Sequence, residues 1–117
     1  IIFGNDAPSG TGIIPLGILR NICQVASVSG IPGEIAVCMA TGNAARVYDK
    51  LNTGMIEVGR EADLIFLDAP MGSVANTAVE AFECGDIPGL SIIMVDGVVK
   101  AAKSRNTPPC KRPAKVL

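Results

Sequence analysis

Asp6 is the acidic residue in this sequence whose position is best suited to chemistry. It follows the apolar residues 1–4, which we predict to form a short buried strand, and active-site residues of α/β folds gather just beyond such strands. A carboxylate there can hold a divalent metal or take a proton from a metal-bound water. Asp6 also fits a turn, because Asn and Asp before Ala-Pro form local turns. The residue types alone leave both interpretations open.

Histidine is absent, and its absence limits the remaining chemistry. It removes the commonest general base and metal ligand, together with every Ser-His-Asp or Cys-His arrangement. The four cysteines form no C-x-x-C pair, so we predict small, buried, reduced thiols of a cytoplasmic protein rather than a zinc site or a disulfide framework. These cysteines are Cys23, Cys38, Cys84 and Cys110.

The other acidic residues and the glycines of residues 10–15 point to structure rather than to catalysis. Pro15 stands where the dinucleotide-binding motif needs Gly or Ala, and no Gly-Lys-Ser/Thr follows, which argues against nucleotide binding. Four aspartates fall at predicted strand edges or turns and four glutamates fit a solvated face. They are Asp63, Asp68, Asp86 and Asp96, and Glu57, Glu61, Glu80 and Glu83.

Composition and charge exclude two classes of protein. With 49% hydrophobic residues and a mean hydropathy of +0.43, the chain is too apolar to be disordered. Its apolar stretches are broken before the roughly 18 residues that a membrane span needs. Residues 100–117 contain six Lys or Arg, no acidic residue, three prolines and no aromatic residue. We therefore predict a basic tail on an acidic face of its own or a neighbouring subunit, and no nucleic-acid partner.

The apolar periodicity and the turn residues predict an α/β chain followed by a small β-rich part. Pro15 begins a helix that Gly30 ends, and Asp96-Gly97 predicts a tight hairpin. A lone buried-type strand cannot form a sheet, so the isolated chain should associate or fold poorly. The predicted elements are strands at 1–4, 55–58, 62–67, 92–95 and 98–100, and helices at 15–29, 32–48 and 74–84.

Four segments in this order resemble the C-terminal third of the amidohydrolase superfamily of metal-dependent hydrolases. They are GNDAPSGTG, AVCMATGNAARVY, NTGMIEVGREADLIFLD and SIIMVDGVVK. The resemblance implies that residues 1–50 are the last strand-helix unit of a (β/α)8 barrel with a trailing helix. It implies that residues 51–117 are part of a C-terminal β-sandwich with the basic tail.

The same resemblance implies the site and the reaction. Asp6 matches the aspartate that ends the eighth barrel strand, contacts a centre of zinc and/or iron, and shuttles a proton. The segment PSGTGIIPLGILRN and the tail are most similar to members that hydrolyse a cyclic amide, such as 6-oxo-1,4,5,6-tetrahydronicotinate. A soluble homo-oligomer such as a tetramer, with no membrane partner, fits this family.

Two other interpretations stay open. The chain is also compatible with an imidazolonepropionase-like or dipeptidase-like member, because substrate loops lie mostly on earlier strands. A non-catalytic assembly module, in which Asp6 only forms a turn, is the alternative outside the enzymes. The other metal ligands would precede residue 1, so we expect the 117 residues alone to be inactive.

Overall fold

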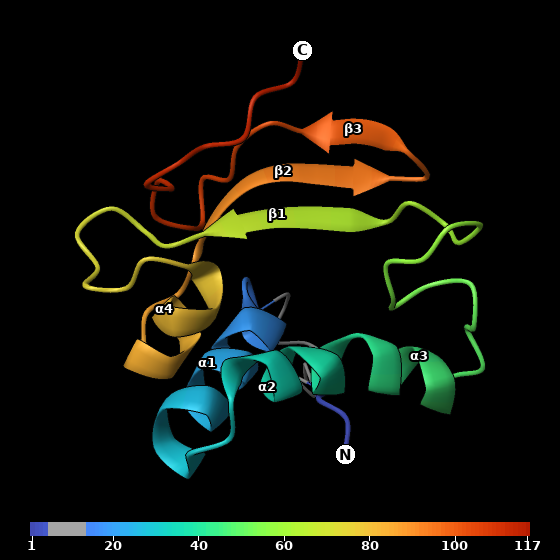
Figure 1. Ribbon diagram of the computed structural model, residues 1–117, viewed down its shortest axis with the longest axis horizontal. Helices are drawn as coiled ribbons and strands as arrows, with labels where there is room; N and C mark the ends of the chain where they lie inside the picture. Colours follow the sequence, from blue (N-terminus) through green and yellow to red (C-terminus); the bar gives the residue numbers. More distant parts are fainter. Residues whose placement is uncertain (5–13) are drawn as a thin grey trace.

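A computed structural model describes residues 1–4 and 14–117 of the chain. In these ranges the helices form one layer and the strands form a sheet beside it (Figure 1). The predicted α/β class is therefore confirmed for this part of the chain. The elements are α1 (Gly17–Ser29), α2 (Gly33–Ala40), α3 (Gly42–Val47), β1 (Leu64–Asp68), α4 (Ala78–Cys84), β2 (Gly89–Val95) and β3 (Val98–Ala101).

Helix α1 follows the predicted helix closely. Its buried face includes Ile22, Cys23 and Ala26, at the spacing expected of a helix that packs on one side. Gly30 ends it with φ 70°, a left-handed conformation that glycine adopts without steric cost. The helix begins at Gly17 because Leu16, with φ 61°, is not yet helical.

The single helix predicted for residues 32–48 is wrong, because the chain breaks into α2 and α3 at Thr41. Thr41 has φ −119° and ψ −94°, and its hydroxyl donates to the Val37 carbonyl at 2.9 Å. The loop around Gly54 fills the break: a Cβ on Gly54 would lie 2.6 Å from the Ala45 Cβ. Gly42 and Ala45, two small residues of α3, pack against this loop.

The three strands form an antiparallel sheet in the order β1-β2-β3. The predicted hairpin is confirmed: Asp96 has φ 51° and Gly97 has φ 72°, positive at both central residues as a tight two-residue turn requires. The Asp63 carboxylate accepts a hydrogen bond from the Asp96 amide at 2.8 Å and fixes the turn from the start of β1.

Two predicted strands are wrong in the described structure. Residues 1–4 and 55–58 adopt no strand, and Ile56 and Val58 are 90% and 103% exposed. A strand is stabilised by hydrogen bonds to a neighbouring strand, and the described residues place none beside either segment. Apolar and β-branched composition alone therefore overestimates strand content here.

Helix α4 is shorter than the predicted 74–84. It begins after Thr77, whose hydroxyl accepts from the Glu80 amide at 3.1 Å, while the Glu80 carboxylate accepts from the Asn76 amide at 2.7 Å. This side-chain capping fixes the first turn. Gly85, with φ 87°, ends the helix as predicted.

Phe82 lies at the centre of the helical core and is 1% exposed. It clusters with buried residues of α1 and with Ala36 of α2, and Leu67 brings β1 against the same cluster. No helix in the described residues is long and apolar enough to cross a membrane.

We expect the isolated 117-residue chain to self-associate, because Ile56, Val58, Val74 and Val28 are each at least 80% exposed and together offer apolar surface to a partner. Size-exclusion chromatography with light scattering should show species whose mass grows with concentration. A monodisperse monomer that melts cooperatively would contradict this expectation.

Candidate functional site

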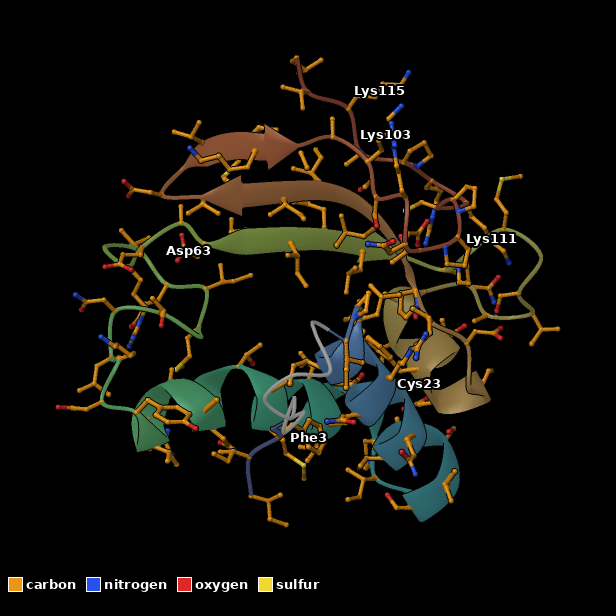
Figure 2. The ribbon with its side chains drawn as sticks, turned by 180° about the vertical axis from the view of Figure 1, so that it is seen from behind. Phe3, Cys23, Asp63, Lys103, Lys111 and Lys115 are labelled. Carbon is orange, nitrogen blue, oxygen red and sulfur yellow. The ribbon has the colours of Figure 1, made fainter. Side chains whose placement is uncertain are left out.

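Asp6, the predicted catalytic and metal-binding residue, lies outside the described residues, as does the glycine-rich segment that follows it. The structure does describe residues 1–4, which lead to it. The Phe3 side chain packs against the helical core, and Figure 2 shows it among the helices. The Phe3 amide donates to the Met39 carbonyl of α2 at 3.4 Å.

Two asparagines hold the same segment from other helices. The Asn21 amide group of α1 donates to the Gly4 carbonyl at 3.0 Å, and that of Asn43 in α3 donates to the Ile1 carbonyl at 3.2 Å. Three helices thus fix the chain immediately before Asp6. Sequence reasoning did not single out either asparagine for this role, although Asn43 lies within the quoted motif ATGNAA.

Asp68 is the buried carboxylate of the sheet and forms a two-pronged ion pair with Arg112. The Arg112 Nη2 donates to Oδ1 at 2.6 Å, and its Nε and backbone amide donate to Oδ2 at 3.0 and 2.8 Å. Arg112 Nη2 also donates to the Asn76 carbonyl at 2.6 Å. This carboxylate therefore joins the end of β1 to the C-terminal segment.

We name residues 107–112 the C-terminal strap. The strap runs beside the chain that follows β1: the Met71 amide donates to the Pro109 carbonyl at 2.8 Å, and the Lys111 amide to the Ala69 carbonyl at 2.9 Å. Its backbone lies so close to β2 that a Cβ on Gly89 would be 2.8 Å from the Cys110 nitrogen. The ion pair thus adds a charged contact to the backbone contacts that hold the strap.

The interpretation of Asp68 as a turn residue is wrong, because its main partner is 44 residues away. The hydrogen bonds and charge of Arg112 lower the pKa of Asp68 to about 2, against the opposing effect of burial. Asp68 is accordingly a structural carboxylate held ionised, with no free oxygen poised for proton transfer. Arg112 of the basic tail thus meets one acidic side chain of its own chain, and the acidic face expected beneath the tail stays a prediction.

Two other acidic side chains also have structural partners. Glu83 accepts from the Gly33 amide at 2.8 Å and joins α4 to the start of α2. Glu57 pairs with Arg60 at 2.6 Å, so these glutamates do more than line a solvated face.

The four cysteines are free, and Cys23 and Cys110 are buried as predicted. The prediction is wrong for Cys38 and Cys84, which are exposed. Burial raises the pKa of the Cys23 thiol, with a further contribution from Asp86, so that thiol stays protonated and inert. Within residues 1–4 and 14–117, no group of three or more His, Cys, Asp or Glu residues could hold a metal ion.

Known proteins resemble the chain over most or all of its length. It is 64% identical to enamidase of Eubacterium barkeri over 117 residues, which are 100% of this chain and 30% of that protein. It is 31% identical to adenine deaminase 2 of Desulfotalea psychrophila over 100 residues, or 86% of this chain and 15% of that one. No protein-family model matches.

The solved structures give the same result. The crystal structure of enamidase, described as a new member of the amidohydrolase superfamily, superimposes with a TM-score of 0.93 at 65% identity. The match covers 99% of this chain and 30% of that one. The chain thus spans about a third of the length of enamidase.

We expect Asp68→Asn to lower the free energy of unfolding at neutral pH by about 1–2 kcal/mol, because an amide replaces a charge-assisted acceptor. Since the pKa of Asp68 falls from its ordinary 3.8 to about 2 on folding, ionised Asp68 stabilises the fold above pH 3.8. That contribution is lost as pH falls from 3.8 through 2. Urea unfolding at a series of pH values measures both effects.

The matched control is Glu61→Gln, at an exposed carboxylate, which should leave the acid profile unchanged. Arg112→Lys keeps the charge but loses the two-pronged geometry, so it should give an intermediate loss. An Asp68→Asn protein with wild-type stability from pH 7 to pH 2 would show that the ion pair contributes nothing.

Proposed function

The chain belongs to the amidohydrolase superfamily, and from that premise we propose that it is part of a hydrolase that cleaves a carbon–nitrogen bond in a cyclic amide. The observation that carries the proposal is 64% identity to enamidase along all 117 residues. Because those residues cover 30% of the relative, the activity of the whole protein rests on segments beyond this chain as well.

The proposed architecture follows the same relative. Residues 1–50 would be the end of a (β/α)8 barrel with its trailing helix, and residues 51–117 part of a β-sandwich with the basic tail. Helices α1–α3 all precede residue 50 and the three strands all follow it, which supports a boundary there (Figure 1). Residues 1–4, which have no strand partner in the described ranges, would complete the barrel beside upstream strands.

Asp6 is the residue of this chain to which we assign catalysis. It would accept a proton from the attacking water and pass it to the leaving nitrogen, a role that needs a carboxylate held at a fixed place. The anchoring of residues 1–4 by Asn21, Asn43 and the Phe3 amide supports such a fixed place two residues away.

A divalent metal, zinc and/or iron, would activate that water, but the described residues of this chain do not fit a metal centre. The chain has no histidine, so Asp6 is the only ligand that we assign to it. The other ligands would come from upstream segments of the longer protein.

The proposed substrate is a small cyclic amide, specifically 6-oxo-1,4,5,6-tetrahydronicotinate, which would give 2-formylglutarate and ammonia. The chain is also similar to two adenine deaminases, at 31% and 36% identity. A cyclic compound with a different C–N bond is therefore the alternative substrate for the same fold. Assay of the full-length protein against cyclic amides, acyl dipeptides, an imidazolone and adenine separates these activities. If the protein hydrolysed only adenine or only a dipeptide, that compound would take the place of the cyclic amide as the proposed substrate.

We propose a cytoplasmic homo-oligomer such as a tetramer as the setting of this activity. The four free thiols support a reducing compartment. The exposed apolar side chains Ile56 and Val58 support burial against other protein surface.

In the full-length protein, Asp6→Ala should lower kcat about a hundred- to ten-thousand-fold, because it removes the proton shuttle. Asp6→Asn keeps the shape of the side chain and should lose as much. The thermal midpoint should stay within about 2 °C of wild type for both, since the role that we assign to Asp6 is proton transfer.

Asp49→Asn is the matched control, because Asp49 is exposed and lies outside the proposed site. It should retain wild-type kcat. Near-normal turnover in Asp6→Ala would favour the alternative of a non-catalytic module in which Asp6 only forms a turn.

A further inference from the structure

The C-terminal strap and the residues before it fold over β2 and surround a cavity of about 500 Å³. A cavity of this size is in the range of sites for small organic molecules. Most of its surface is apolar, and Leu90, Met71 and Pro109 contribute to it. Figure 2 shows the labelled Lys103 and Lys111 beside the sheet, on the C-terminal segment, whereas Phe3 lies among the helices.

The charged side chains that line this cavity are both basic. Lys103 and Lys111 contribute to the lining, and no aspartate or glutamate does. Neither lysine belongs to an ion pair among the residues that the structure describes, where the pairs are Arg60–Glu57 and Arg112–Asp68. The residues that line the cavity therefore carry a net positive charge.

Local contacts hold Lys111 in place without neutralising it. Its Nζ donates to the Ala75 carbonyl at 2.7 Å, which uses one of the three ammonium protons. The two remaining protons can reach a further acceptor. A lysine that is already ordered loses less conformational entropy when it binds an anion.

Two hydroxyl groups add donors to the lining. The Thr107 hydroxyl accepts from the Leu90 amide at 3.1 Å, and the Ser104 hydroxyl accepts from the Asn106 amide at 3.1 Å. Each hydroxyl oxygen that accepts from an amide keeps its own proton for another acceptor. Thr107 is buried, so its donor is shielded from bulk water.

We propose that this cavity binds a small organic carboxylate. The carboxylate would lie between Lys103 and Lys111, with the Thr107 and Ser104 hydroxyls as further donors, and the apolar body would lie against Leu90. Charge-assisted hydrogen bonds hold the anion, and the apolar wall favours an organic anion over inorganic phosphate. Binding requires no hydrolysis, so it is measured separately from the activity proposed above.

Calorimetric titration of the full-length protein with benzoate tests the site, with benzamide as the uncharged probe of the same shape. Benzoate should bind saturably in the millimolar range or tighter, and benzamide and inorganic phosphate at least about tenfold more weakly. Lys103→Gln should weaken benzoate binding several-fold, and Lys103→Gln/Lys111→Gln about tenfold or more. Lys100→Gln, at a cation of β3 outside the cavity, should bind benzoate as wild type does.

Lys103→Gln carries the test if the double variant fails to fold, because Lys103 is exposed and makes no hydrogen bond in the described structure. Unchanged benzoate affinity in Lys103→Gln, no saturable binding at all, or equal affinity for phosphate would each overturn the proposal. Loss of catalysis in Asp6→Ala with intact benzoate binding would support both proposals independently.

Discussion

The ion pair between Asp68 and Arg112 is the constraint that ties the C-terminal strap to the end of β1. A buried carboxylate at the end of β1 needs compensation, and Arg112 supplies it with three donors from its side chain and backbone. The pKa of Asp68 is lowered to about 2, because the folded structure favours the ionised carboxylate. Without this partner the C-terminal strap would keep its backbone hydrogen bonds and those of the Thr107 hydroxyl and the Lys111 ammonium, but it would have no ion pair to the sheet.

The helical layer has a different role, which is to fix residues 1–4. The hydrophobic cluster around Phe82 sets the relative positions of α1, α2 and α4, and Phe3 packs against that cluster. Asn21 and Asn43 then reach the backbone of the same segment. The break at Thr41 matters here because it starts α3 as a separate helix, and Asn43 stands in its first turn.

Local signals predicted part of this fold well. Gly30, Gly85 and the Asp96-Gly97 turn have positive φ values that few other residues adopt, so their positions can be inferred from neighbouring residues alone. Residues 1–4 and 55–58 show the limit, since a strand depends on a partner that the local sequence does not specify. The pairing of Asp68 with Arg112 has the same origin: 44 residues separate them, and no motif links them. The prediction of Asp6 rests on its position and on the family resemblance, whereas Lys103 and Lys111 become neighbours of one cavity only after the strap folds over β2.

Gly89 shows how little room separates β2 from the strap. Any larger residue would place its first side-chain carbon 2.8 Å from both the Cys110 nitrogen and the Pro108 oxygen, and these are backbone atoms that cannot rotate away. The glycine is needed here for clearance rather than for an unusual dihedral angle. Engineering of this region therefore has an asymmetric tolerance: substitutions at the exposed residues 114–117 leave the clearance intact, whereas a side chain added at position 89 would push the strap away from β2.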